Sequence, residues 1–337
     1  MQNKLDELYA LFKLIDKDIL GGVTKFKKEH YVVGEKFGRR FMELGYKNLD
    51  EVRQKTAPYI MRRTKKEVAP DLPERVYSKV YVDMYKPQEE LYKEIEGSFQ
   101  MLQEEINEFY KSQSEADARQ GKKAKNEDMI LGYLYMLQAT SNHPMQLAKS
   151  DSKMAKAYLP FIREARNSAK LDELIEILGP LMEEESKVII FSQYTSMLEI
   201  IYNHIFTHFD FYPYVIHGGV PAKDRTRFVN EFSEHPLRNI MLLSDAGNYG
   251  LNIQSASTLI NYDSNWNPSV MEQRRGRIHR IGSSHEVVTF VDLISNNTID
   301  ETIQKTQKRK EELGEGLVEK DKAEIEAMAK LIDELKK

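Results

Sequence analysis

The sequence predicts an α/β protein in which a parallel β-sheet is flanked by helices and preceded by a large helical region. Residues 166–305 alternate short apolar runs with amphipathic stretches, a pattern typical of parallel strands joined by right-handed helical crossovers. Residues 1–165 instead carry apolar residues at helical spacing, as in LDELYALFKLI and LYKEIEGSFQMLQEEINEFYK. The 41% hydrophobic content of the 337 residues is enough for a sizeable core.

The helical first half contains two segments of different character. Residues 75–85, RVYSKVYVDMY, have a β-like pattern, and residues 112–128 are polar and lysine-rich, as expected of a loop or a mobile helix tip. We therefore divide the chain into four parts: a helical and connector region, 1–85; a helical protrusion, 86–165; an α/β lobe, 166–305; and a charged terminal helix, 306–337.

Five apolar runs in the α/β lobe are expected to be strands covered on both faces: KVIIFS, YPYVIH, NIMLLS, TLINYD and VVTFVDLI. Ligands of parallel sheets bind at the carboxyl ends of the strands. Small or polar residues follow four successive runs: Ser192 and Gln193; His217, Gly218 and Gly219; Ser244, Asp245, Ala246 and Gly247; and Asp263, Asn265 and Trp266. These four sets predict one site at that edge of the sheet.

Residues 273–282, QRRGRIHRIG, carry four arginines, with one glycine, Gly276, between them. Like charges three or four residues apart on a helix repel by about 0.2–0.5 kcal/mol per pair, and a glycine inside a helix costs about 1 kcal/mol against alanine. A purely structural helix would avoid both costs. At about 100° per residue, Gln273, Arg277 and Arg280 fall on one narrow face, which predicts a joint function. A solvated basic face is the alternative interpretation.

Composition excludes several classes of protein. The chain has no cysteine, which excludes disulfides and thiolate metal sites, and its eight histidines show no H-E-x-x-H spacing, so we expect no metal site. The net charge of −4 confines nucleic-acid binding to local basic patches. Apart from the arginines, these are Lys25, Lys27 and Lys28; Arg62, Arg63, Lys65 and Lys66; and Lys122, Lys123 and Lys125. No apolar run approaches the ~18 residues of a membrane span, and no signal segment opens the chain. We expect a soluble intracellular protein.

Several motifs occur in the order and spacing of a known family. KVIIFSQYTSMLEII, HGGVPAKDRTRFVNEF, LLSDAGNYGLNIQSAS and YDSNWNP followed by QRRGRIHRIG resemble motifs IV to VI of the Swi/Snf-type ATPases, which are superfamily 2 helicase-like DNA translocases. YIMRRTKKEVAPDLPE resembles the family's arginine-rich connector, and LQATSNHP resembles its asparagine-histidine-proline turn. The resemblance covers nearly the whole chain and implies that residues 166–305 form a RecA-like lobe of the P-loop NTPase type.

The resemblance also implies roles for individual residues. Arg277 and Arg280 match the family's arginine fingers, which reach the γ-phosphate of ATP, and Gln273 would orient that face or touch the nucleotide. Arg274 and Arg275 would have structural or phosphate-pairing roles. The remaining matches are Gly250 and Asn252 on the nucleotide side of the cleft, Ser192, Gln193, Arg225 and Ser244 on DNA phosphates, and Trp266 in the DNA groove. Core packing is the alternative interpretation of Trp266.

The chain has no G-x-x-x-x-G-K-[ST] phosphate loop and no strand ending in a magnesium-binding acidic motif. In the family both lie on an N-terminal lobe, so the resemblance implies that this lobe is the partner that binds most of the ATP and Mg²⁺. We expect the C-terminal half of an ATP-dependent double-stranded DNA translocase, inactive by itself. A strand-separating RNA or DNA helicase lobe and a non-catalytic RecA-like module that docks on a partner remain alternatives.

Two positions depart from the family pattern. Gly276 takes the place of the usual acid before the first finger arginine, and Asn248 and Tyr249 follow Gly247 where two adjacent glycines are usual. These departures favour a prokaryotic or phage translocase, acting in the cytoplasm of a prokaryotic or phage-infected cell, over a eukaryotic nucleosome remodeller.

Overall fold

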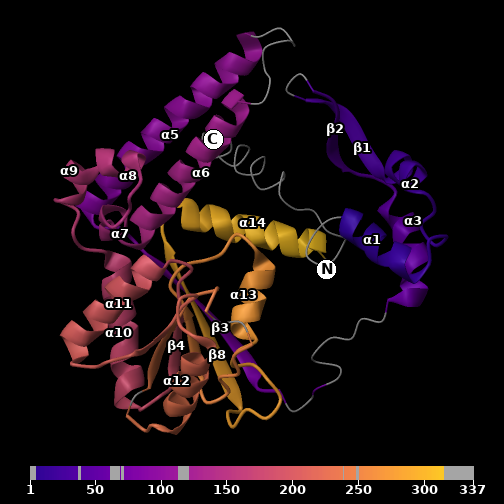
Figure 1. Cartoon of the computed structure of the whole chain (residues 1–337). Helices are drawn as coiled ribbons and strands as arrows, with labels where there is room; N and C mark the ends of the chain where they lie inside the picture. Colours follow the sequence, from indigo (N-terminus) through magenta and orange to yellow (C-terminus); the bar gives the residue numbers. More distant parts are fainter. Residues whose placement is uncertain are drawn as a thin grey trace. The chain divides into compact units, whose positions relative to one another are not determined.

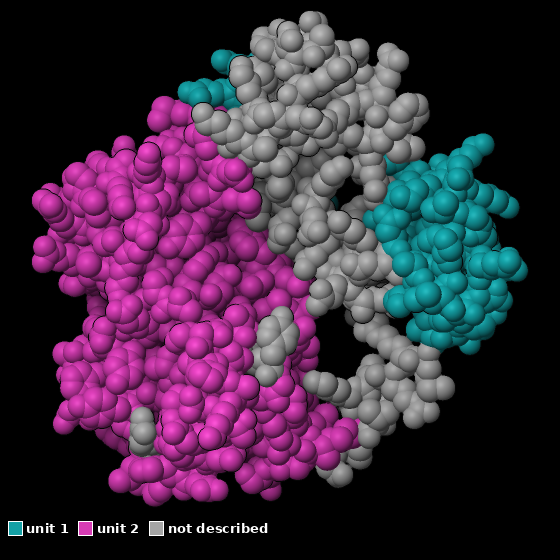
Figure 2. Space-filling model, viewed as in Figure 1, with its two compact units in different colours: residues 1–68, 104–126, 308–337 teal, residues 69–103, 127–307 magenta. Residues whose placement is uncertain are grey.

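The computed structural model describes residues 5–36, 39–60, 69, 72–112, 121–237, 239–247 and 250–314 (Figure 1). The chain divides into two compact units (Figure 2). Unit 1 contains residues 1–68, 104–126 and 308–337, and unit 2 contains residues 69–103 and 127–307. Most of residues 59–74, the segment resembling an arginine-rich connector, lie outside the described residues, as do residues 113–120 and 315–337.

Unit 2 is built on a six-stranded sheet in the order β3-β8-β7-β4-β6-β5, and every neighbouring pair is parallel. The strands are β3 Glu74–Val82, β4 Val188–Phe191, β5 Tyr214–Ile216, β6 Ile240–Leu243, β7 Thr258–Asn261 and β8 Val287–Ser295. All five predicted strands are confirmed. The β-like segment that we assigned to the connector region adds the edge strand, β3.

The register aligns the carboxyl ends of the strands. Ile216, Leu243, Phe191 and Asn261, the last residues of β5, β6, β4 and β7, form one row across the sheet. Asp292 of β8 continues this row beside Asn261. Because the four strands end together, the loops that follow them begin at one edge.

Helices cover both faces of the sheet. Val188 and Ile190 of β4 pack with residues of α10 Ala169–Glu183 and α11 Thr195–Phe209, whereas Ile189 and Phe191 face the opposite core with Phe232 of α12 Ala222–Glu234. This alternation follows from the two-residue period of a strand. The predicted α/β class with a RecA-like parallel sheet is therefore confirmed, with its core between the sheet and these helices.

The remaining helices that lie wholly or partly in unit 2 are labelled in Figure 1. They are α5 Lys86–Ser112, α6 Gly121–Asn142, α7 Met145–Ala148, α8 Lys153–Ala157, α9 Leu159–Ile162, α13 Pro268–Arg275 and α14 Ile299–Gly314. Within unit 2, α5 and α6 pack through Phe99 and Tyr133, whose ring centroids lie 5.6 Å apart. In the part of the chain that the structure describes, no helix is both long and apolar enough to cross a bilayer.

A buried ion pair fixes α10 and α14 to the end of the sheet. The side chains of Lys170 and Asp300 are 1% and 2% exposed and bond each other directly. Asp300 also accepts hydrogen bonds from the Ser141 hydroxyl at 3.2 Å and from the backbone N–H of Ser295 at 3.1 Å. A buried charge pair persists when its remaining hydrogen-bonding groups are satisfied. The network therefore ties the end of α6, within the LQATSNHP turn, to the end of β8.

Unit 1 has a small core of its own. It contains α1 Leu5–Ile15, α2 Val23–His30, the antiparallel pair β1 Tyr31–Lys36 and β2 Arg39–Tyr46, α3 Leu49–Thr56 and the 3₁₀ turn η1 Ala57–Tyr59. Leu5, Leu8, Phe12, Phe26 and Val52 are buried together between these elements. The two strands are a feature that the helical pattern of residues 1–85 did not predict.

Candidate functional site

The loops at the carboxyl edge interlock through short contacts. The Ser192 hydroxyl, after β4, bonds the carboxylate of Asp263, after β7, and the backbone N–H of Gln193 donates to the same carboxylate at 2.9 Å. Gly247, after β6, lies so close to the β5 loop that a Cβ there would be 2.7 Å from the Cα of His217. Only glycine fits this approach. The four polar sets predicted to share an edge are thus in direct contact.

Arg274 holds the centre of this edge. Its side chain is fully buried, and its Nε and Nη2 donate to the two carboxylate oxygens of Asp245 at 2.6 and 2.7 Å. Its Nη1 donates to the Asp263 carbonyl at 2.7 Å and to the Asn261 side chain at 3.1 Å. The guanidinium also lies 5.2 Å from the Phe191 ring centroid. One side chain thus joins α13, β4 and the loops after β6 and β7.

The electrostatics of this network follow from its burial. Burial raises the pKa of the Asp263 carboxyl, and the neighbouring Arg274 guanidinium acts in the opposite direction. Burial by itself lowers the pKa of Arg274, but the hydrogen bonds and charge of Asp245 outweigh it, so that the pKa lies above its ordinary value. A buried charge costs several kcal/mol unless it is paired. Of the two roles anticipated for Arg274, structural or phosphate-pairing, its burial and its pairing with Asp245 favour the structural one.

The helical face predicted for Gln273, Arg277 and Arg280 does not exist. Helix α13 ends at Arg275, and Gly276 is its C-cap, with φ −64° and ψ −2°. The chain then turns and places Ile278 fully inside the core. Gln273 remains exposed on α13, whereas Arg277 and Arg280 lie on the following turn. Burial of the Ile278 side chain in the core requires the chain to turn at this point, so the helix stops before these two arginines.

Arg277 contacts the loop that carries the predicted nucleotide residues. Its Nη1 donates to the Leu251 carbonyl at 3.0 Å, and its own carbonyl accepts from the backbone N–H of Ile253 at 3.1 Å. Gly250, whose φ is +76°, and Asn252 are exposed on this loop. The structure thus brings Arg277 together with the segment of Gly250 and Asn252. The Nε of Arg280 donates to the Gly276 carbonyl at 2.8 Å, which folds this side chain back over the turn.

The residues expected to hold DNA phosphates stabilise the loops in this conformation. Ser192 is fully buried and Ser244 is 2% exposed, and the Ser244 hydroxyl accepts from the backbone N–H of Gly247 at 3.1 Å. The Arg225 guanidinium donates to the carbonyls of Val220, Gly218 and Gly247 at 2.6, 2.8 and 3.4 Å. Gln193 is partly buried beside Asn265, with 3.5 Å between their side-chain amides. All four belong to the edge.

Trp266 is partly buried on the turn between β7 and α13. Both neighbouring residues are held in place. The Asn265 carbonyl accepts from the Gln307 side chain of α14 at 2.5 Å, and the Asn267 side chain caps α13 by accepting from the backbone N–H of Ser269 at 3.0 Å. The indole is therefore presented by a rigid turn beside the other edge residues.

Sequence reasoning missed the partners of Arg274. Asp245 and Asp263 were noted only as members of the polar sets that follow two strands, and Asn261 was taken for part of a strand. A usable signal was present, because two acids that follow strands of one parallel sheet at the same edge require a cation when they are covered.

Two domain families match the sequence. The SNF2-related domain matches residues 1–146, and the helicase conserved C-terminal domain matches residues 169–282, the part that holds the edge and the arginine turn. The chain belongs to the SNF2 family of helicase-like ATPases. The resemblance drawn from the motifs is thereby confirmed.

Relatives in this SNF2 family come from eukaryotes and bacteria. The human SWI/SNF-related matrix-associated actin-dependent regulator of chromatin subfamily A member 1 is 30% identical over 306 residues, which cover 90% of this chain and 27% of that protein. The ISWI chromatin-remodeling complex ATPase ISW1 of Saccharomyces cerevisiae is 27% identical, with 96% and 27% covered. YwqA of Bacillus subtilis is 26% identical, with 99% and 33% covered. The chain thus spans about a third or less of these relatives.

Solved SNF2-family structures share the fold. The Sulfolobus solfataricus SWI2/SNF2 ATPase core in complex with double-stranded DNA is 26% identical with a TM-score of 0.54, covering 92% of this chain and 59% of that one. The C-terminal part of the Fun30 ATPase domain has the same TM-score of 0.54 at 20% identity, covering 70% and 89%. The mixed origin of the relatives leaves the prokaryotic or phage source as a prediction.

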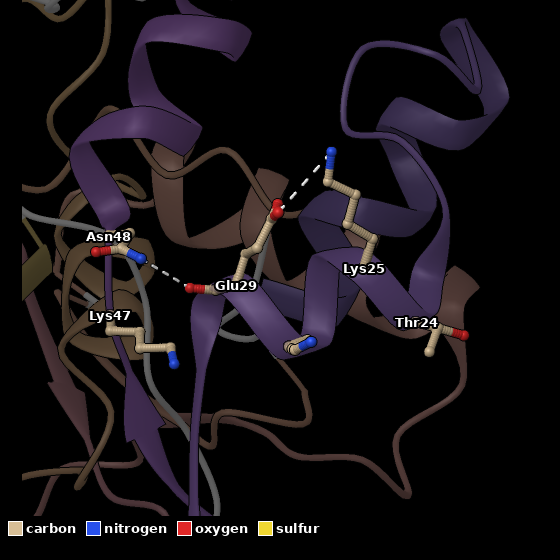
Figure 3. Close-up of a pocket in the computed structure, with 6 residues that line it drawn as sticks. Thr24, Lys25, Glu29, Lys47 and Asn48 are labelled. Atoms are coloured by element: carbon tan, nitrogen blue, oxygen red, sulfur yellow. Dashed lines mark hydrogen bonds and ion pairs between the residues drawn. The ribbon is translucent and has the colours of Figure 1, made fainter.

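One concavity of this SNF2-family chain lies within unit 1. It is lined by Thr24, Lys25, Lys28, Glu29, Lys47 and Asn48 (Figure 3). Lys25 lies 3.8 Å from the Glu29 carboxylate, and the Asn48 amide donates to the Glu29 carbonyl at 2.9 Å. One predicted basic patch is therefore partly neutralised here. Its third member, Lys27, pairs with Asp6 at 3.2 Å.

Beside this concavity, Glu29, His30 and Glu51 offer side-chain atoms within 4.8 Å of one another, a spacing compatible with a metal ion. Both carboxylates already have a lysine partner, since Lys55 lies 2.7 Å from Glu51. A divalent ion would have to displace these lysines. We therefore assign no chemistry to this cluster.

Proposed function

We propose that this chain is the second RecA-like lobe of an ATP-driven double-stranded DNA translocase, acting with an N-terminal lobe that carries the phosphate-binding loop. The observation that carries the proposal is the match over 92% of the chain with an SWI2/SNF2 core solved on double-stranded DNA. The DNA-facing role is taken over from that protein, and the chemistry is taken from the residues of the edge.

On the nucleotide side, Arg277 and Arg280 would stabilise the charge on the transferring γ-phosphoryl group of ATP. Arginine suits this role because it is always charged and presents a planar fork of donors. Arg277 now donates to the Leu251 carbonyl, and it would exchange that acceptor for a phosphate oxygen when the lobes close. Gln273 would line the same side from α13, and Gly250 and Asn252 would complete it. The other lobe would hold Mg²⁺ and make most of the contacts with the phosphates.

On the DNA side, the phosphate backbone would lie along the loops of the carboxyl edge. Ser192, Gln193, Arg225 and Ser244 hold these loops, and Trp266 would enter a groove from the turn after β7. Contacts of this kind fix the position of a duplex without reading its sequence. Closure on ATP and opening after hydrolysis would then move the lobe along the DNA.

Two assays test this function. The chain alone should show no ATP hydrolysis stimulated by DNA, because it lacks a phosphate loop; turnover that disappears in the Arg277→Ala, Arg280→Ala double variant would contradict this. When the chain is joined to the lobe that carries the loop, hydrolysis should respond most strongly to duplex DNA. A stronger response to single strands or RNA would favour a strand-separating helicase, and no response to any of them would favour a docking module.

A further inference from the structure

The edge strand β3 reaches the arginine turn through one side chain. Nη2 and Nη1 of Arg75 donate to the two carboxylate oxygens of Glu272, in α13, at 3.0 and 3.4 Å. The same guanidinium lies 3.0 Å from Nδ1 of His279, beyond the end of that helix. Arg75 and its partners are about 200 positions apart in the chain, with separations of 197 and 204. This cross-link was not visible in the sequence.

His279 is locked into one tautomer by its two partners. A guanidinium can only donate hydrogen bonds and a carbonyl can only accept them. Nδ1 of His279 faces Arg75, and its Nε2 lies 3.0 Å from the Pro73 carbonyl. The imidazole must therefore accept at Nδ1 and donate at Nε2. Since the ring is only 5% exposed, it forms a fixed bridge from the arginine turn to the start of β3.

Glu272 and His279 lie on either side of the bend at Gly276. The bend decides where Arg277 and Arg280 point, because α13 ends at Arg275, before both of them. From the core side it is held by Ile278. From the β3 side it is held by Arg75, which grips the helix before the bend and the turn after it. Tyr77 of β3 adds a ring 5.4 Å from the Arg275 guanidinium.

We propose that Arg75 is a positioning residue that sets the arginine turn for ATP hydrolysis, acting through Glu272 and His279. This inference rests on the proposed function of Arg277 and Arg280 and adds a residue outside the motifs that carry it. Arg75 belongs to the strand that directly follows the connector segment.

The first test is amide hydrogen exchange of the chain itself, followed in a peptide covering residues 272–285. Backbone N–H groups of Gly276, Arg277, Ile278 and His279 donate to carbonyls of residues 272–275, and these bonds slow their exchange. In Arg75→Ala their exchange should quicken on the order of tenfold. The matched control is Lys79→Ala, on the same face of β3, whose side chain contacts Gln304 of α14 instead. It should leave the peptide unchanged.

If Arg75→Ala fails to fold, Glu272→Gln replaces it, because it weakens the same pair from a partner that is 46% exposed. Faster exchange confined to residues 272–285 supports the proposal. Unchanged exchange in both variants overturns the proposal. Equal acceleration across the whole sheet also overturns it, because that result indicates a general loss of stability.

The second test measures turnover in the two-lobe ATPase. Arg75→Ala should lower kcat roughly tenfold and change KM for ATP little, as expected for a loss confined to the transition state. In an Arg277→Ala, Arg280→Ala background it should lower kcat no further, because both groups through which it acts are then absent. A further tenfold loss in that background overturns the positioning role. If Arg280→Ala alone keeps normal turnover, the proposed function fails. If Arg280→Ala loses turnover but Arg75→Ala keeps it, only the inference about Arg75 fails.

Discussion

Arg274 and Arg277 are three positions apart, and both are buried, but their hydrogen-bond partners differ in kind. Arg274 is fully buried, lies in the last turn of α13 and makes four hydrogen bonds that join three segments of the edge. Arg277 lies beyond the bend, is 8% exposed, and donates from Nη1 to the Leu251 carbonyl, in the loop that carries Gly250 and Asn252. The first is paired with a carboxylate inside the edge, whereas Nη1 of the second donates to a neutral carbonyl.

This difference assigns two roles to one arginine-rich segment: Arg274 stabilises the fold, and Arg277 and Arg280 are expected to act in ATP hydrolysis. Removing one member of a buried ion pair leaves an uncompensated charge, which costs about 3–5 kcal/mol. Removing a finger costs no such penalty, but it removes charge stabilisation in the transition state. Stability and turnover should therefore separate cleanly between Arg274 on one side and Arg277 and Arg280 on the other.

The largest expected effect is on turnover. In the two-lobe ATPase, Arg280→Ala and Arg277→Ala should each reduce hydrolysis by roughly 10³–10⁵-fold, the usual loss for an arginine finger. Binding of duplex DNA should change little, because these side chains serve the nucleotide. Steady-state hydrolysis and a DNA-binding titration on the same preparations measure both. Near-normal hydrolysis in either variant would show that the assignment of that arginine is wrong.

The next effect is on folding. Arg274→Met keeps the aliphatic length of the side chain but leaves Asp245 and Asp263 without their cation, and should lower the free energy of unfolding by about 3–5 kcal/mol. Urea unfolding of the chain measures this. Arg280→Ala is the matched comparison and should shift it by no more than about 0.5 kcal/mol. Equal losses in the two variants would remove the distinction between framework and finger.

The sequence predicted the strands because their apolar runs are short, continuous and bounded by polar residues, and burial on both faces requires that composition. The prediction of a continuous helix through Gly276 was wrong, and burial is again the cause. Helical spacing describes residues 268–275, but the position of Ile278 in the core, which only the three-dimensional fold defines, ends the helix there.

Long-range pairing explains the other omissions. Residues 75–85 have a strand pattern, yet nothing local indicates that Glu74 pairs with Val287 at the other end of the lobe. The same holds for Arg75 with His279. The candidate site could be predicted at the level of an edge and a set of residues, since each follows a strand, but the hydrogen bonds among these residues depend on contacts that the chain makes across the sheet.

A third prediction concerns how the stability of the folded chain depends on pH through the buried His143. Burial, followed by the nearby His204, lowers the pKa of His143 to about 4 from an ordinary 6.5, while Asp172 acts in the opposite direction. Between these values the unfolded chain binds the proton and the folded chain does not, so stability falls as the pH drops from about 6.5 to about 4. At about 1.4 kcal/mol per pKa unit, the loss amounts to roughly 3 kcal/mol.

Urea unfolding at a series of pH values, for the chain and for His143→Asn, measures this contribution. The variant carries no titrating group at this position, so its stability should decline less over the same range. Parallel curves for the two proteins would mean that other groups cause the acid sensitivity. Arg277→Ala, outside this region, should follow the curve of the unmodified chain.

The smallest expected effect on folding is at Trp266, where two interpretations compete. A core tryptophan replaced by alanine costs about 3–5 kcal/mol, whereas a surface change usually stays within about 0.5 kcal/mol. Trp266 is partly buried, and its turn is fixed from both sides by Asn265 and Asn267 through backbone and capping bonds that do not involve the indole. We therefore expect Trp266→Ala to leave unfolding nearly unchanged and to impair movement along duplex DNA in the two-lobe enzyme while ATP hydrolysis continues. Thermal unfolding of the chain beside a translocation assay tests both halves, and a large drop in Tm would place the indole with the framework of Arg274 rather than with the DNA surface.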